Sequence, residues 1–188
     1  EIPLRLVGSE MCIRDRDMNR TLIIRQEQPE DFDTIRKIIK EAFAGAEHTD
    51  GDEHNLVDRL RLTGDYIPEL SLIAEINDTA AGHIMFSRIF IGDAEAIALA
   101  PLSVLPAYQK QHIGQTLIHA AHQKAKALGY SCSTVLGSPA YYPKCGYQPA
   151  RTFGIIPPFE VPEEFYMVCP LNPPVPQGVV RYSPAFGI

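Results

Sequence analysis

The residues from Leu105 to Thr116, LPAYQKQHIGQT, have the types and order that could hold a phosphate. Pro106 ends the preceding strand because it has no N–H, and we expect a helix to begin near Ile113 or Gly114. The first amides of a helix have no intrahelical partner, and the helix dipole favours an anion beside them. Gly114 has no Cβ, so the backbone there can approach a guest closely. The turn therefore predicts a site for phosphate or pyrophosphate.

On these residues alone, a second interpretation stays open, because a polar turn in front of a helix is also common as a plain surface loop. The turn is not a P-loop, since it has no Gly-Lys-Ser or Gly-Lys-Thr. It also lacks the glycine triplet of a dinucleotide fingerprint, because His112 stands where a second glycine would be expected.

The surrounding segments predict the elements that would position this turn. Apolar residues at helical spacing indicate a first helix over residues 29–43, a second from 53 closed by Gly64, and a third ended by Gly129. Between the second and third helices, three strand-like runs follow one another with turn signals at residues 77–78 and 92–93, which predicts an antiparallel meander. Further expected strands cover residues 21–25, 131–137 and 163–171, with a helical turn or short helix over 138–147. The fold class is α+β: a mixed central sheet flanked by helices.

Composition narrows the classes of partner. The chain has 188 residues, 45% of them hydrophobic, which fits a single domain with a substantial core. Its net charge of −6 argues against nucleic acid as the main partner, and no apolar run approaches the roughly 18 residues of a membrane span. The four cysteines show no paired CxxC spacing, so we expect no metal site and no disulfide framework, but reduced thiols of a cytoplasmic protein.

The first seventeen residues, EIPLRLVGSEMCIRDRD, are unlike the rest of the chain. They have neither the apolar core of a signal peptide nor the character of a transit peptide. We expect residues 1–17 to be a non-native, disordered leader, and residues 18–188 to form one domain. A natural disordered extension is the alternative.

The turn and its context resemble the GCN5-related N-acetyltransferases, the GNAT superfamily. In motif A of that family a strand is followed by [Q/R]-x-x-G-x-[G/A] and a helix; here Gln109 matches the first position, Gly114 the last, and His112 departs from the middle glycine. The segment VLGSPAYYPKCGY and the terminal YSPAFG resemble the YhbS-like branch of predicted acetyltransferases. The resemblance extends from Met18 to Gly187 and implies a GNAT fold with acetyl-CoA as co-substrate.

The resemblance implies a role for each matched position. Backbone groups of Leu102, Ser103 and Val104 would bond the pantetheine arm, on a strand that splays from its neighbour. The pyrophosphate loop would run from Gln109 to Gly114, with two more residues at the helix start. The expected cofactor-binding residues after the strand are Gln109, Lys110, Gln111, His112, Ile113, Gly114, Gln115 and Thr116.

Tyr142 falls at the tyrosine that, in many family members, protonates the leaving thiolate. Attack of an amine on a thioester expels a thiolate, and a phenol held nearby can supply a proton. The alternative for Tyr142 is a packing residue whose hydroxyl bonds a neighbour. We expect Tyr141 to pack into the core, and we reject Cys145 as a nucleophile because the sequence shows no His or acid partner for it.

An acceptor amine arrives protonated, since alkyl amines have a pKa near that of lysine, about 10.4. Glu53, at the start of the second helix, is the first candidate for the general base in the region that borders the acceptor pocket of this fold. Glu95 is the second, and His48 and His54 have suitable ordinary pKa values. A chain of waters without a dedicated base is the alternative.

The sequence thus predicts an acyl-CoA-dependent N-acyltransferase, transferring acetyl to a primary amine of a small molecule or peptide by direct attack in a ternary complex. Two alternatives stay open: a non-catalytic acyl-CoA-binding or regulatory module, and a transferase that uses another acyl group or acceptor. The acceptor is not identified, and assembly as a homodimer is left open.

Overall fold

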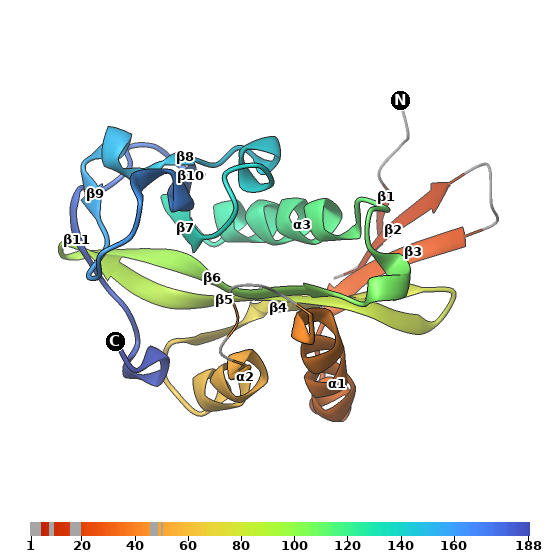
Figure 1. The fold of residues 1–188 in the computed structure, drawn as a ribbon. Coiled ribbons are helices and arrows are strands. Elements are labelled where there is room, and N and C mark those ends of the chain that lie inside the picture. Colours follow the sequence, from red (N-terminus) through yellow and green to blue (C-terminus); the bar gives the residue numbers. More distant parts are fainter. Residues whose placement is uncertain (1–4, 8–9, 16–19, 46–48, 50) are drawn as a thin grey trace.

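The fold is built on one continuous mixed sheet with helices on both faces (Figure 1). It is seen in a computed structural model that describes residues 5–7, 10–15, 20–45, 49 and 51–188. The strand order is β1-β2-β3-β4-β5-β6-β7-β10-β8, and β11 joins the sheet through β5. Helices α1 and α2 cover one face, and α3 covers the other. We call these the α1/α2 face and the α3 face.

The elements have the following bounds. The helices are α1 (Phe32–Phe43), α2 (Glu53–Arg61) and α3 (Ile113–Ala127), with short 3-10 turns at Pro29–Asp31, Pro106–Tyr108, Tyr142–Cys145, Ala150–Phe153, Glu163–Phe165 and Pro184–Phe186. The strands are β1 (Arg5–Val7), β2 (Glu10–Asp15), β3 (Arg20–Gln26), β4 (Tyr66–Ile76), β5 (Thr79–Ile91), β6 (Ala94–Val104), β7 (Cys132–Leu136), β8 (Gln148–Pro149), β9 (Ile155–Ile156), β10 (Tyr166–Pro170) and β11 (Gly178–Arg181).

The predicted antiparallel meander is present as β4, β5 and β6. Asn77 and Asp78 both have positive φ, as a tight two-residue hairpin requires, and Gly92 with φ 59° turns the chain into β6. Parallel pairing occurs between β6 and β7, across the connection that contains α3. This combination is the mixed α+β sheet that the sequence predicts.

The helices follow the predicted pattern, with one correction. In α1, the apolar positions Ile35, Ile38 and Ile39 are at most 2% exposed, and burial of each such side chain contributes about 1.5–3 kcal/mol. Gly129, with φ 89°, lies just past the end of α3, as expected of a terminating glycine. The expectation that Gly64 closes α2 is wrong: α2 ends at Arg61, and Gly64 does not have the positive φ of such a cap.

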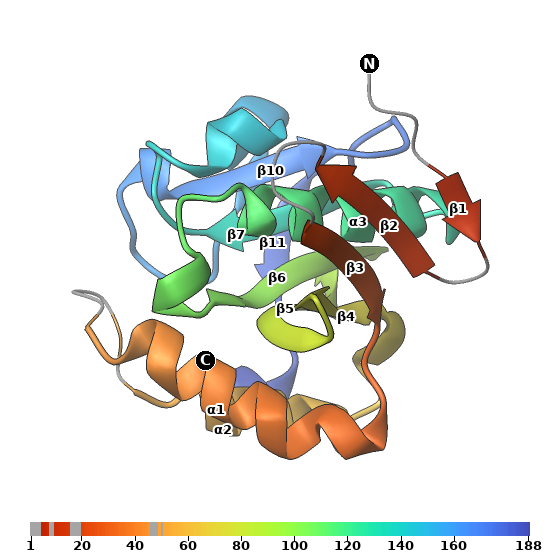
Figure 2. The same ribbon diagram turned by 90° about the vertical axis from the view of Figure 1, so that its right-hand side faces the viewer.

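The described part of the first seventeen residues forms two strands, whereas a disordered leader was expected. Strand β2 pairs with β3 from Met11 opposite Ile24 to Asp15 opposite Arg20, and β1 pairs with β2 (Figure 2). Without that pairing β3 would be the edge of the sheet, and an edge strand offers unpaired N–H and C=O groups to any extended segment. Residues 1–4, 8–9 and 16–17 lie outside the described part, and a non-native origin for this segment stays a prediction.

The parallel pairing of β6 with β7 is short. It covers only Ile97 opposite Ser133 and Ala98 opposite Thr134, whereas β6 continues to Val104. Beyond Ala98, β6 keeps its other neighbour, β5, as far as Val104 opposite Gly82. Among the described residues, no strand pairs with the β7-facing edge of β6 from Leu99 to Val104, which is the splay that the family resemblance implies.

Candidate active site

The turn between β6 and α3 is braced from within. Gln109 Nε2 donates to the carbonyl of Val104 (3.1 Å), and Gln111 Nε2 donates to the carbonyl of Ala107 (3.2 Å). Both glutamine side chains thus bond the backbone of their own loop. Helix α3 begins at Ile113, as predicted, so its free first amides lie directly after this turn.

His112, the departure from the family pattern, has a left-handed backbone, with φ 61° and ψ 8°. Lys110 also has φ 61°. This region costs a non-glycine residue roughly 1–2 kcal/mol. His112 is held there by local bonds: its Nδ1 lies 2.9 Å from Gln115 Oε1, and its carbonyl accepts from the amide and hydroxyl of Thr116 at 3.0 Å each. The loop thus keeps a glycine-like conformation without the glycine.

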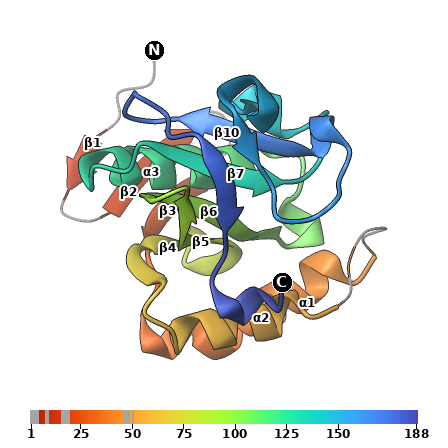
Figure 3. The ribbon, with the colours of Figure 1, turned by 90° about the vertical axis from the view of Figure 1, so that its left-hand side faces the viewer.

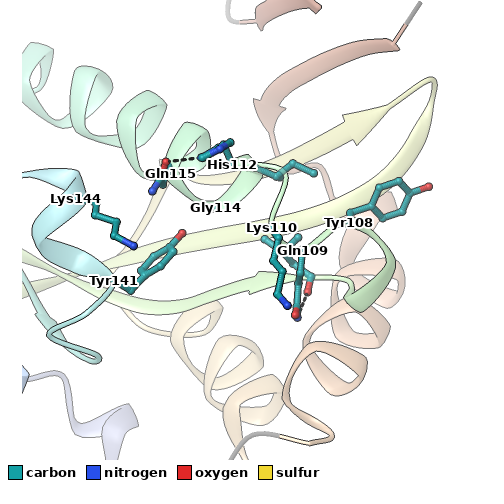
Figure 4. A pocket seen from close by; sticks show the side chains of 10 residues that line it. Tyr108, Gln109, Lys110, His112, Gly114, Gln115, Tyr141 and Lys144 are labelled. Carbon is teal, nitrogen blue, oxygen red and sulfur yellow. Dashed lines mark hydrogen bonds between the residues drawn. The ribbon is translucent and has the colours of Figure 1, made fainter. Parts of the chain in front are cut away.

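A hollow of about 450 Å³ lies in front of this turn. Figure 4 shows Lys144 and Tyr141 on one side, Lys110 and Gln109 on the other, and the start of α3 above them. Two ammonium groups and a helix N-terminus favour an anionic guest. The lining residues are Val104, Tyr108, Gln109, Lys110, His112, Ile113, Gly114, Gln115, Tyr141 and Lys144.

Most of the predicted cofactor residues meet at this hollow, and four do not line it. Leu102, Ser103, Gln111 and Thr116 are outside the lining set, although Leu102 and Ser103 belong to the open part of β6. Sequence reasoning did not assign Tyr108, Tyr141 or Lys144 to the site. The last two stand in the YYPKCGY segment, so the signal was present in the sequence.

Gly114 is required by close packing as well as by access for a guest. A Cβ at this position would clash with the hydroxyl of Tyr141 and would lie 3.4 Å from Leu102 Cδ2. The structure therefore brings the start of α3 against the segment that follows β7. The two parts of the family pattern, the loop and the tyrosine segment, form one wall.

The two adjacent tyrosines both pack against the core, but only one of them lines the hollow. The expectation that Tyr141 packs into the core is confirmed, and its hydroxyl in addition lies against Gly114 at the hollow. Tyr142 is outside the lining set; its ring contacts Gly137 and meets the ring of Tyr147 edge-on, with centroids 5.6 Å apart. Burial raises the pKa of Tyr141 to about 12 and also raises that of Tyr142, so both hydroxyls keep their protons at neutral pH.

A buried polar cluster supports Tyr142 from behind. Ser133 Oγ donates to the hydroxyl of Tyr147 (2.9 Å), and His122 Nε2 lies 3.1 Å from that hydroxyl and 2.8 Å from Ser133 Oγ. Burial lowers the pKa of His122 to about 4, so its ring is neutral. Burial also raises the pKa of Cys145, which is the opposite of what an activated nucleophile needs.

The candidates for the general base lie in different places. Glu53 begins α2, is half-buried and accepts a hydrogen bond from Thr49 Oγ1. Glu95 lies 3.6 Å from the guanidinium of Arg88, at the start of β6. It is about 30 Å along the strand from Val104 at the hollow, by the rise per residue, and its role as a base stays a prediction. Burial lowers the pKa of His54, and His48 lies outside the described residues.

No group of three or more His, Cys, Asp or Glu side chains among the described residues is arranged to hold a metal ion. No helix among the same residues is long and apolar enough to cross a membrane.

Comparison with known proteins agrees with this geometry. The family model "Acetyltransferase (GNAT) family" matches residues 32–147. The Escherichia coli K12 protein named "Uncharacterized N-acetyltransferase YjhQ" is 34% identical over 139 residues, which cover 71% of this chain and 74% of that protein. A GNAT family acetyltransferase from Brucella melitensis, solved in complex with acetyl-CoA, is 32% identical, with a TM-score of 0.74 over 88% of this chain and 97% of that one.

The splayed mixed sheet and the hollow at the start of α3 therefore define an acetyltransferase fold of the GCN5-related type. The chain belongs to the GNAT family of N-acetyltransferases. The expected likeness to the YhbS branch is also confirmed. E. coli YhbS is 28% identical over 130 residues, and its structure with CoA shares the fold, with a TM-score of 0.81 over 93% of this chain and 97% of that one.

Proposed function

We propose that this chain transfers an acyl group, acetyl in the first place, from acyl-CoA to a primary amine of a small molecule or peptide. The observation that carries the proposal is the hollow where the start of α3, two lysines and Tyr141 converge beside the open edge of β6. The Brucella relative binds acetyl-CoA, and the E. coli YhbS structure contains CoA.

Two parts of the cofactor, the pyrophosphate and the pantetheine arm, have counterparts in this arrangement. The pyrophosphate would lie against the first amides of α3, between Lys110 and Lys144, whose ammonium groups offset its charge. The pantetheine arm would bond the open backbone of Leu102 to Val104 as an added strand does. That placement brings the thioester to the splay between β6 and β7.

The reaction would be direct attack within a ternary complex. The amine nitrogen forms a bond to the thioester carbonyl carbon, the C–S bond breaks, and the thiolate takes up a proton. Tyr142 remains our proposed proton donor, and Tyr141, whose hydroxyl faces the hollow, is the competing donor. General acid catalysis is worth roughly 10²–10⁴-fold in rate.

Two variants separate the tyrosines. Phenylalanine removes only the hydroxyl, so Tyr142→Phe should lower kcat by about 10²-fold or more and leave the affinity for acetyl-CoA nearly unchanged. Tyr141→Phe is the matched control at the adjacent position. If Tyr141→Phe lowers kcat strongly and Tyr142→Phe keeps the wild-type kcat, the proton donor is Tyr141.

Glu53 is proposed as the residue that takes the acceptor's proton, directly or through water. It starts α2 beside the segment that borders the acceptor in our reading of the fold. Glu53→Gln keeps the size of the side chain and removes its basicity. An unchanged kcat at saturating amine would remove Glu53 from the mechanism.

The whole proposal is tested in two steps. First, acetyl-CoA at 100 times its Kd should stabilise the protein by about 2.7 kcal/mol and raise its Tm; no shift at millimolar acetyl-CoA contradicts cofactor binding. Second, a panel of primary amines should release free thiol from acetyl-CoA. Binding without thiol release would favour the alternative of a non-catalytic acyl-CoA-binding module, and release only from other acyl-CoAs would favour a different acyl group.

We also propose a cytoplasmic location. Cys132, Cys145 and Cys169 are free thiols, and two of them are buried among the strands of the sheet. Free thiols persist in a reducing compartment.

A further inference from the structure

A second polar cluster lies on the α1/α2 face, opposite the hollow. Ile84 and Phe86 of β5 pack with α3, so the alternating residue His83 faces the other side, with Met85. The His83 and Glu27 side chains are 0% exposed, and that of Arg61, from α2, is 7% exposed. Charged and titratable groups are rarely buried to this extent.

Glu27 is held as a carboxylate by four donated hydrogen bonds. Arg61 donates twice, at 3.0 and 2.9 Å, and the hydroxyl of Tyr66 donates at 2.7 Å. His83 Nε2 lies 2.9 Å from Glu27 Oε2. Burial opposes the charged form, but the bonds from His83 and Arg61 outweigh it and hold the pKa of Glu27 well below its usual range.

This carboxylate fixes the tautomer of His83. An ionised carboxylate can only accept hydrogen bonds, so the proton of the neutral imidazole must be on Nε2. Nδ1 then presents a lone pair, and it is buried with no hydrogen-bond partner among the described residues. Burial lowers the pKa of His83, against the opposing effect of Glu27, so the resting ring is neutral.

His83 lies beside the part of the sheet where chemistry is proposed. His83 lies opposite Ser103 in the β5–β6 register, and cross-strand neighbours have Cβ atoms about 4.5–5.5 Å apart. Ser103 Oγ is also buried and, within the described part of the chain, has no hydrogen-bond partner. Ser103 stands between Leu102 and Val104, on the open segment of β6.

Two buried polar atoms on cross-strand neighbours, both without a partner among the described residues, are unusual in a protein interior, where nearly all such groups are bonded. Ser103 can hydrogen-bond to His83 Nδ1 directly, after a rotation of its hydroxyl, or through one bridging water. Because the cofactor is proposed to lie on the α3 face, the amine approaches the thioester from the α1/α2 face, to which both side chains belong.

We propose that Glu27, His83 and Ser103 form a buried relay that takes up the proton of the acceptor amine. This inference rests on the acyltransferase function proposed above and competes with Glu53 for the same step. Ser103 is the member nearest the reacting atoms, and His83 and Glu27 act through it.

The protons balance in one sequence. The amine enters this step neutral, after its ammonium proton has passed to solvent. As its nitrogen bonds to the carbonyl carbon and the C–S bond breaks, the nitrogen loses a second proton to Ser103 Oγ, whose own proton passes to His83 Nδ1. The imidazolium that forms is paired with Glu27, and the thiolate takes its proton from a tyrosine hydroxyl. After the products leave, the proton on His83 returns through Ser103 to the site, and the tyrosine is reprotonated. The groups that face His83 and set its charge are Glu27, Asp31, Arg61, Tyr66, Ser71 and Ser103.

The first test reads the tautomer and needs no amine substrate. In the full-length protein labelled with ¹⁵N-histidine, the His83 signals are those that disappear in His83→Gln. We expect a proton on Nε2 and an unprotonated Nδ1 between about pH 6 and 8. A proton on Nδ1, or on both nitrogens over that range, would overturn the relay whatever the enzyme's acceptor is.

The second test separates a relay from a merely architectural cluster. His83→Gln keeps an amide N–H for Glu27 and removes the Nδ1 lone pair. Ser103→Ala removes the hydroxyl that, in this proposal, links His83 to the splay. Both should lower kcat by about 10²-fold or more with little change in the KM for acetyl-CoA. In His83→Gln, the fall of kcat at acidic pH should also disappear from the pH profile of kcat. Ser87→Ala is the control, because Ser87 is also buried on β5 with an unpartnered Oγ.

The outcomes are distinct. If both variants keep the wild-type kcat and the wild-type fall of kcat at acidic pH, the cluster has only a structural role. If His83→Gln does not fold, Ser103→Ala alone decides, because it leaves Glu27 and Arg61 paired. Failure of the wild-type protein to release thiol with any amine would contradict the proposed function, whereas the tautomer measurement would still confirm or refute the geometry of the relay.

Discussion

The two polar regions on opposite faces of the sheet are built in opposite ways. The hollow on the α3 face is open, carries lysines at its rim and depends on a loop in which two non-glycine residues have left-handed backbone. The Glu27–His83–Arg61 cluster on the α1/α2 face is buried, and its carboxylate is paired with Arg61 and bonded to His83. The difference indicates that the first region is shaped to admit a large anion and the second to hold protons in fixed places.

The largest effect we expect is on the stability of the buried cluster. Arg61→Ala would leave the Glu27 carboxylate buried without its main partner, which costs about 3–5 kcal/mol in the free energy of unfolding. Urea unfolding followed by circular dichroism measures it. The matched control is Arg59→Ala, since Arg59 is on the same helix and its side chain is 44% exposed; a similar loss in both variants would contradict the special status of the cluster.

Acidification should act on the same region. Because the pKa of His83 is lowered by folding, stability begins to fall as pH drops below the unfolded value of about 6.5. The depressed pKa of Glu27 adds a loss below its unfolded value of about 4.3, which continues as pH falls towards its folded pKa. Each unit of difference between the folded and unfolded pKa corresponds to about 1.4 kcal/mol in the free energy of unfolding. In His83→Gln, the free energy of unfolding should fall less steeply between pH 6.5 and 5 than in the wild type. An unaltered slope would refute the assignment of this loss to His83.

The lysines test the other face. Lys144→Ala should weaken acetyl-CoA binding about tenfold, or about 1.4 kcal/mol, since a charged hydrogen bond to phosphate is worth about 1.5–3 kcal/mol and this rim is open to solvent. Calorimetric titration measures the change. Lys124→Ala, on the same molecule but outside the hollow, should bind as the wild type does. Equal affinities in the two variants would place the phosphates elsewhere.

Close packing at Gly114 gives a smaller effect. Gly114→Ala adds a methyl group against the Tyr141 hydroxyl, and we expect a loss of about 1 kcal/mol, the low end for overpacking, because the tyrosine can turn aside. Tyr141→Phe in the same chain should recover most of the loss. Gly64→Ala, where the added atom meets open space, is the control. Failure of the double variant to recover stability would refute the contact.

The smallest effect concerns His112. His112→Gly removes the cost of a left-handed backbone but loses the bond to Gln115 and adds chain entropy in the unfolded state, so we expect a gain below about 1 kcal/mol. Lys110 has the same φ, and Lys110→Gly should gain more stability because this substitution does not remove the bond to Gln115. Thermal unfolding compares them, and a loss of stability in both would contradict strain in the loop.

The same contrast explains what the sequence could predict. The hollow is built mainly from a contiguous turn and from YYPKCGY, so the positions of Gln109 and Gly114, the start of α3 and the meander before it could all be inferred from local patterns. The identity of the tyrosine that faces the hollow could not, because adjacent residues point in different directions and only packing against Gly137 and Gly114 decides between them.

The cluster on the α1/α2 face was out of reach of sequence reasoning. Glu27 follows β3, Arg61 ends α2 and His83 lies within β5, so no spacing along the chain links them. The β3–β4–β5 register and the packing of α2 on the sheet bring them together. The C-terminal segment is a similar case (Figure 3). Strand β11 pairs with β5. The turn after β11 contacts α2, because Arg59 Nε donates to the carbonyl of Ala185. A proline-rich tail gives no local sign of such a return.

The central claim is that acetyl-CoA binds at the start of α3, on the face away from the buried cluster. Titration of the ¹⁵N-labelled full-length protein with acetyl-CoA, followed through its amide resonances, tests this most directly. We predict saturable shifts for the amides of residues 110–115 and 144, and for those of 102–104 along the open edge of β6, with Arg61 nearly unmoved. Absence of saturable shifts at millimolar acetyl-CoA, or shifts confined to α1 and α2, would contradict the account.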